Sequence, residues 1–246
     1  MKTINAYIIE KLKISKTPSY TLFPKNINEL STMITMEIKR NGNECDLNHI
    51  DTSKITNMEG LFRDSNFNGD ISKWNVSNVT TMNHMFSSSK FNNDISDWDV
   101  SNVKNMERMF LHADFDGDIS GWDVSKVYNM AFMFSGTLFN ADISDWDVSS
   151  VTNMAGMFHN SKFNGDLSKW RIINVIDMHQ MFNYSAFNNN SILHWDVSSV
   201  RDMSWMFEES SFNQDISKWK INMHCRTYNM FNHCPIKSKY KPKLPK

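Results

Sequence analysis

The sequence predicts an α/β repeat solenoid, a stack of short coils that each contain one strand and one short helix. Three observations support this prediction: tryptophan recurs at a nearly constant spacing, other apolar residues recur with it, and the apolar spacing changes inside each repeat. The composition agrees, since 246 residues include 18 Met, 17 Phe and 8 Trp but only 10 Leu and 6 Ala. A core of so few residue types indicates one short template copied many times.

Seven tryptophans mark the repeat. They are spaced by 24 residues, with one interval of 25, and they are Trp74, Trp98, Trp122, Trp146, Trp170, Trp195 and Trp219. Columns of Phe, of Val or Ile, and of Met-Phe pairs keep the same step. About eight repeats of 24 or 25 residues are therefore expected over residues 46–238, with atypical repeats at both ends because each end faces water.

Within one repeat, residues 70–93, the apolar spacing predicts two elements. Trp74 and Val76 alternate with polar residues, which is typical of a short strand with one buried face. From Val79 to Phe86 the apolar residues are three or four positions apart, which predicts a short helix. The polar residues that follow predict a turn.

The segments beside the repeats predict caps. Residues 20–45 are expected to form an N-terminal capping region, with a helix over residues 27–40 that covers the open edge of the first coil. Its apolar residues are Ile27, Leu30, Met33, Ile34 and Ile38. Residues 239–246 are rich in lysine and are expected to form a basic, flexible tail.

Residues 1–19 predict a further helix. Its apolar residues Ile4, Tyr7, Ile8 and Leu12 would lie together if residues 3–14 are helical. Two interpretations stay open: the helix folds onto the first coil, or it is a docking segment that recruits the solenoid to another molecule.

The run DISDWDVSSVTNMAGMF at residues 142–158 resembles the repeat of the BspA-like (DUF285) family of bacterial surface proteins. The resemblance recurs over about 190 of the 246 residues, since the pattern of apolar columns repeats along the chain. It implies a leucine-rich-repeat-like, right-handed coil with a parallel β-sheet, and a role in adhesion or host contact.

The N-terminus and the cysteines bear on location. Residues 1–16 lack the uninterrupted apolar stretch and the cleavage site of a secretory signal, and no run of about 18 apolar residues predicts a membrane span. The three cysteines are too few for a disulfide framework. A cytoplasmic or virion-associated location is therefore expected in preference to the cell surface.

One column of acidic residues precedes the tryptophans by four positions. It consists of Asp70, Asp94, Asp118, Asp142, Asp166 and Asp215, with Asn190 at the interruption. Capping of turns is the favoured role, and calcium bound between coils is the alternative, because hard cations take oxygen ligands. No metal site and no cofactor are predicted.

The exposed positions beside Trp and Val are the candidate partner-binding residues, because only these columns vary inside a constant frame. They are acidic in the middle coils and become basic later: Asp97, Asp99, Asp123, Asp145, Asp147, Arg171, Asp196, Lys218 and Lys220. Such a segregated face would steer a charged partner. The alternative is a solvated face on which repeat copying multiplied an acidic consensus.

These features predict a non-enzymatic recognition or adhesion module. Phosphate-binding loops, nucleophile elbows and zinc-protease motifs are missing from the sequence, and the adjacent His-Cys pairs at 224–225 and 233–234 match no common zinc spacing. A protein partner is favoured, a glycan is the second candidate, and no nucleic acid is expected. The alternative function is a structural component of a virion or surface assembly, anchored by the N-terminal segment.

Overall fold

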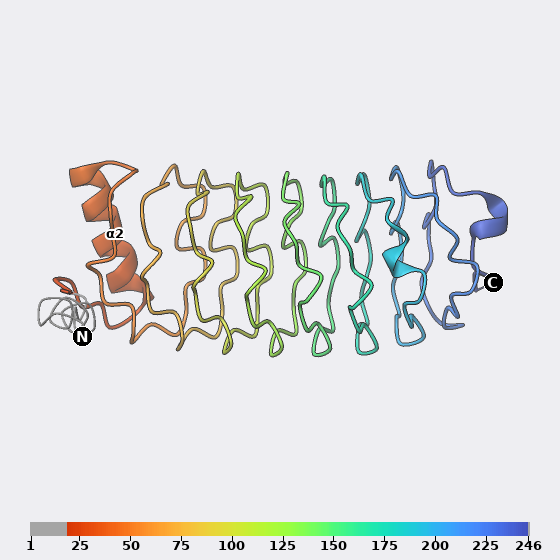
Figure 1. Ribbon diagram of the computed structural model, residues 1–246, viewed down its shortest axis with the longest axis horizontal. Helices are drawn as coiled ribbons and strands as arrows, with labels where there is room; N and C mark the ends of the chain where they lie inside the picture. Colours follow the sequence, from red (N-terminus) through yellow and green to blue (C-terminus); the bar gives the residue numbers. More distant parts are fainter. Residues whose placement is uncertain (1–18, 246) are drawn as a thin grey trace, which may run out of the picture.

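Side chains that recur along the sequence stack directly on one another in the structure. The computed structural model describes residues 19–245, and Figure 1 shows them as a row of coils that lie side by side. The rings of Phe62 and Phe86 are 5.6 Å apart and nearly parallel, and those of Trp74 and Trp98 are 6.4 Å apart. Each repeat therefore covers the core of the next, as the recurring columns predict.

Between the central coils, the described backbone hydrogen bonds run along one side, at residues 80–90 and their equivalents. In residues 82–88, the N–H groups of Met82, His84, Phe86 and Ser88 donate to carbonyls of the next coil at 2.7–3.0 Å. We call this run of bonds the turn ladder, and it recurs in residues 58–64, 106–112, 130–136, 154–160, 178–184 and 203–209, with 227–233 as the equivalent segment of the last coil. All of these bonded N–H groups point towards the C-terminal end of the row.

The predicted short helix is wrong, because the turn ladder takes its place. The remaining N–H groups stay inside the coil, where Met85 donates to the Met82 carbonyl and Ser87 to the His84 carbonyl. His84 and Ser88 both have a φ of 55°, in the left-handed region, which a continuing right-handed helix cannot include. Turns closed over three residues place apolar side chains three or four positions apart, as an α-helix does, so the apolar spacing fits both.

The predicted parallel β-sheet is also wrong. Within residues 19–245 the coils are linked by isolated parallel bridges, such as Thr81 with Asn105, and no strand forms. Residues 94–103, where a strand was expected, donate no described backbone hydrogen bond to another coil; turns close at Trp98 and at Val103 instead. The α/β, leucine-rich-repeat-like architecture is thus replaced by coils made of turns.

Tryptophan supplies the missing link on that side. The indole N–H of Trp98 donates to the carbonyl of Ile71 in the preceding coil at 3.2 Å, and Trp146 donates to Ile119 at 3.1 Å. Trp146 is only 2% exposed, so these bonds lie inside the core. A buried carbonyl without a donor costs about 1–3 kcal/mol, which explains why Trp and not Phe fills this column.

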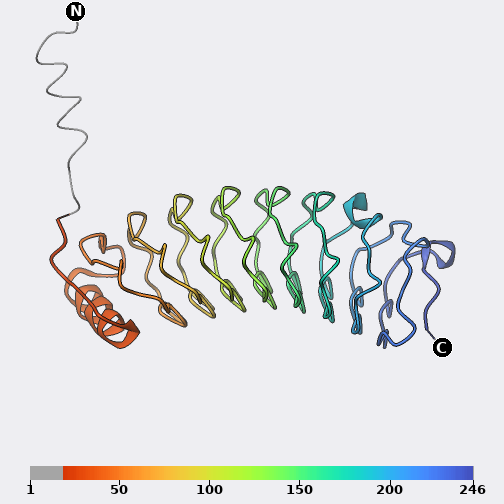
Figure 2. The ribbon, with the colours of Figure 1, turned by 90° about the horizontal axis from the view of Figure 1, so that it is seen from below.

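The row is bent (Figure 2). On the turn ladder, the rings of Phe86 and Phe110 are 5.6 Å apart, whereas the rings of Trp74 and Trp98 are 6.4 Å apart. The coils therefore approach more closely along the turn ladder than along the tryptophan side. This difference places the turn ladder on the inner side of the bend.

Helix α2, Ile27–Asn41, caps the N-terminal end of the row (Figure 1). The Asn26 side chain accepts from the Glu29 N–H and starts the helix, and Leu30 and Ile34 are buried in the core. Ile34 stands 24 residues before Met58, in the register of the turn ladder. The helix expected over residues 27–40 is therefore present, and it occupies the place of a preceding ladder.

The C-terminal segment packs on the last coil as far as Lys241, in place of the expected flexible tail. The Ile216 N–H donates to the Tyr240 carbonyl at 3.0 Å, beside the short 3-10 helix η2, Ser238–Tyr240. The Lys241 ammonium lies 5.3 Å from the centroid of the Phe231 ring and covers the end of the Phe column. The other 3-10 helix, η1 (Asn190–Ile192), accommodates the one-residue insertion.

Replacement of Gly156 by alanine tests the turn ladder. Gly156 has a φ of 57°, and an added Cβ would lie 2.2 Å from Cε1 of Phe132. Gly156→Ala should lower the free energy of unfolding by about 1–3 kcal/mol, measured by urea denaturation. Gly121→Ala is the matched control, because an added Cβ there meets no atom within 4 Å. Equal effects of the two substitutions would contradict the turn-ladder geometry.

Candidate interaction surface

All nine residues of the predicted partner-binding set are exposed. They are Asp97, Asp99, Asp123, Asp145, Asp147, Arg171, Asp196, Lys218 and Lys220. They flank buried tryptophans and buried Val or Ile residues, which fix their spacing along the row. The predicted docking residues Ile4, Tyr7, Ile8 and Leu12 lie outside the described residues.

Four of these aspartates also close turns. The carboxylates of Asp99, Asp123, Asp147 and Asp196 accept from the backbone N–H of the serine two residues later, at 3.0–3.1 Å. The serine hydroxyl and then the serine N–H lower the pKa values of Asp99, Asp147 and Asp196. These side chains are therefore constrained in direction, and a charge-reversing substitution would also remove a turn acceptor.

Three of the nine predicted residues meet in one hollow, at the boundary between the acidic and the basic coils. Asp145, Asp147, Lys169 and Arg171 line it, together with Trp146, Val148 and Ser149. The Lys169 ammonium pairs with Asp145, and this hydrogen bond and its charge raise the pKa of Lys169. Both signs of charge therefore face the same small recess.

The other predicted residues do not join this hollow. Lys218 lines a second recess with Leu193, His194 and Asp215. Asp97, Asp99 and Asp123 extend the acidic surface over the preceding coils. The face is thus acidic before the recess and mixed after it, where Asp196 lies between Arg171 and the two lysines, Lys218 and Lys220.

The Asp column that precedes the tryptophans caps turns, which is the role that the sequence favoured over calcium binding. Asp94, Asp118 and Asp142 accept from the N–H groups of Ser96, Ser120 and Ser144 at 2.9 Å. At the insertion the cap is Asn189, which accepts from Ser191, and not Asn190. The described residues contain no group of three His, Cys, Asp or Glu side chains placed to hold a metal ion.

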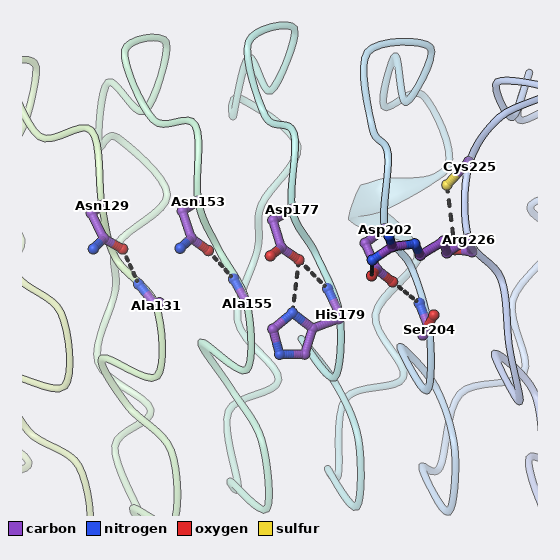
Figure 3. A network of polar contacts seen from close by, with 10 residues as sticks. All are labelled: Asn129, Ala131, Asn153, Ala155, Asp177, His179, Asp202, Ser204, Cys225 and Arg226. Atoms are coloured by element: carbon purple, nitrogen blue, oxygen red, sulfur yellow. Dashed lines mark hydrogen bonds and ion pairs between the residues drawn. The ribbon is translucent and has the colours of Figure 1, made fainter.

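A second polar column lies on the turn ladder, and the sequence interpretation missed it. Asn129 and Asn153 accept from the N–H groups of Ala131 and Ala155, and in the next coils Asp177 and Asp202 take the same position (Figure 3). The sequence shows this column as a recurring Asn or Asp, because each of these residues directly precedes a Met of the repeat. The amide-to-carboxylate change adds charge at half-buried positions.

Both carboxylates of that column have cationic neighbours. The His179 ring Nδ1 lies 2.8 Å from Oδ1 of Asp177, and an Arg226 guanidinium nitrogen lies 3.5 Å from Oδ2 of Asp202 (Figure 3). The hydrogen bond to Asp177 raises the pKa of His179 despite its partial burial. The protonated ring therefore stabilises the fold at low pH, and this contribution is lost as the pH rises through the raised pKa.

The His-Cys pairs do not form a site. Cys225 is buried where earlier coils have Val, whereas His224 is exposed. Burial raises the pKa of the Cys225 thiol to about 11, and burial also raises the pKa of Cys234. Both thiols are therefore protonated at neutral pH and serve as packing groups.

The fold and surface define a tandem-repeat protein with a constant core and variable exposed columns. The family described as "Mycoplasma protein of unknown function, DUF285" matches residues 28–137, 113–190 and 161–236. The chain belongs to this family, which confirms the resemblance of its repeats. No curated protein and no solved structure matches the chain. Within residues 19–245 no helix has the length and apolar character needed to cross a bilayer.

Acid should destabilise the protein through its turn caps. Hydrogen bonds from serine N–H groups, and then from serine hydroxyls, lower the pKa values of Asp94, Asp118 and Asp142. Because the folded pKa lies below the unfolded value of about 3.9, the stabilisation is complete above pH 4 or so and is lost as the pH falls through the folded pKa. We expect the melting temperature to fall steeply below about pH 4. A melting temperature that is flat down to pH 2 or so would contradict this role.

Proposed function

We propose that the chain is a non-enzymatic recognition module that binds a protein partner through its exposed charged columns. The recess at Asp145, Asp147, Lys169 and Arg171 is the centre of the proposed contact. The supporting observation is that these variable charged side chains are exposed and directed by a constant, fully packed frame.

The charge boundary favours a partner with a complementary boundary. Acidic coils precede the recess and basic residues begin within it, so a partner carrying a basic and an acidic region would bind in one orientation. The turn to Ser149 holds Asp147, so little freedom of that side chain remains to be lost on binding. Adhesion is one use of such a surface, in line with the bacterial surface proteins that the repeats resemble.

A glycan partner is the second candidate for the same surface, since its exposed carboxylates can accept hydrogen bonds from sugar hydroxyls. The structural alternative, anchorage in a virion or surface assembly through residues 1–16, depends on a segment outside the described residues. It stays a prediction.

Charge-neutral variants at the recess test the proposal. The triple variant Asp145→Asn, Asp147→Asn, Arg171→Gln neutralises three of the four charged side chains of the recess and leaves Lys169. The amide introduced at position 147 would retain a turn-accepting oxygen. The parent chain is immobilised to capture a partner. We expect the triple variant to bind that partner about tenfold more weakly and to keep the melting temperature of the parent. The readout is the salt-dependent dissociation constant of that partner.

Asp64→Asn is the matched control, because Asp64 is an exposed aspartate on the turn ladder of another coil. It should bind like the parent chain. Equal partner binding by the triple variant and the parent would reject this recess as the contact. If a purified glycan binds the parent chain and not the triple variant, the partner is a glycan and not a protein.

A further inference from the structure

The last coil ends the turn ladder with a row of open donors. In every earlier coil, the alternate N–H groups of this segment donate to the next coil at 2.7–3.0 Å. The equivalent groups of the last coil are those of Thr227, Asn229, Phe231 and His233. No described residue accepts from any of these four N–H groups, whereas the N–H groups of Met230, Asn232 and Cys234 close turns within the coil as usual.

The two ends of the row differ in this respect. At the N-terminal end, α2 occupies the place of a preceding ladder and buries Leu30 and Ile34 against the first coil. At the C-terminal end, the segment after Cys234 turns to the other side, where Tyr240 accepts from Ile216 and Lys241 covers Phe231. Tyr228, Asn229, Asn232 and His233 remain exposed. The end of the ladder is thus open to a ligand.

The chain after Asp215 carries only positive charge, although Glu208 of the preceding ladder accepts a hydrogen bond from the Asn232 side chain at 2.8 Å. Residues 216–246 contain no Asp or Glu and eight Lys and Arg: Lys218, Lys220, Arg226, Lys237, Lys239, Lys241, Lys243 and Lys246. Because all ladder N–H groups point towards this end, the positive ends of their peptide dipoles point there as well. Backbone donors and cationic side chains therefore favour the same kind of ligand, one with many acceptors and negative charge.

We propose that the C-terminal end of the row binds an acidic polypeptide segment of a partner that adopts the turn conformation of a next coil. Its backbone carbonyls would accept from Thr227, Asn229, Phe231 and His233, as the carbonyls of a next coil do elsewhere in the row. Its carboxylates would lie among the lysines of residues 237–243. This site is separate from the charged recess and does not depend on it.

A polypeptide fits the donors better than a nucleic acid does. The same N–H row, repeated in each earlier coil, accommodates peptide carbonyls from alternate residues. A phosphate backbone would satisfy the charge but offers no carbonyl row in that register. Main-chain pairing of this kind gives affinity, and the side chains of the bound segment give selectivity.

Replacement of Thr227 by proline removes one donor without removing a charge. The Thr227 N–H has no described acceptor, its φ is not positive, and Arg226 before it lies in a parallel bridge, an extended conformation that suits the residue before proline. Thr227→Ala keeps the N–H and is the matched control. The probe is a short fluorescent peptide of alternating Glu and Thr, and binding is followed by polarisation and by amide exchange.

We expect the peptide to bind the full chain and Thr227→Ala equally, and Thr227→Pro about threefold to tenfold more weakly. The amides of Asn229, Phe231 and His233 should exchange more slowly when the peptide is bound. The triple variant at the charged recess should bind the peptide like the parent chain, so that failure at one site is distinguishable from failure at the other.

Three results would overturn the proposal. The first is equal binding of the peptide to Thr227→Pro and Thr227→Ala, which would indicate charge attraction alone. The second is tighter binding of a single-stranded oligothymidylate that is insensitive to Thr227→Pro, which would indicate a nucleic-acid surface. The third is self-association that depends on Thr227, seen by sedimentation, which would make a second copy the occupant.

Discussion

Each coil can satisfy only half of the N–H groups in its turn ladder, and the rest of the structure depends on this constraint. Left-handed residues such as His84 and Ser88 direct alternate N–H groups out of the coil, where only a neighbouring coil can accept them. An unsatisfied buried N–H costs about 1–3 kcal/mol. Neighbouring coils are therefore bound to one another in register, and the aromatic columns follow that register.

The repeat, its core columns and the helix near residues 27–41 were predictable from the sequence, because stacking requires the same residue type at the same step. The local conformations were not. A step of three from Val79 to Met82 to Met85 fits a helix and also fits turns closed over three residues. Alternation at Trp74 and Val76 fits a strand, but turns on both sides leave too few residues for one.

The exposed positions of the charged columns were predictable as well, whereas their second role was not. The charge of Asp99 and Asp147 predicts contact with a partner, yet each also closes a turn with the serine two residues later. The spacing of Asp and Ser was visible in the sequence, but a solvated face and a capped turn share that pattern. The position and charge of these aspartates could be inferred from the repeat. Their role as hydrogen-bond acceptors could not, because it depends on the backbone conformation.

Backbone bonds join the coils along the turn ladder and not along the tryptophan side. Scalar couplings across hydrogen bonds, measured by NMR, test this arrangement most directly. We expect couplings from the amide nitrogen of Phe110 to the carbonyl carbon of Met133 and from that of Phe134 to Met157, where the bonds are 3.0 Å long. Couplings that instead link Asp99 or Val100 to the coil containing Val124 would contradict it and restore a parallel sheet.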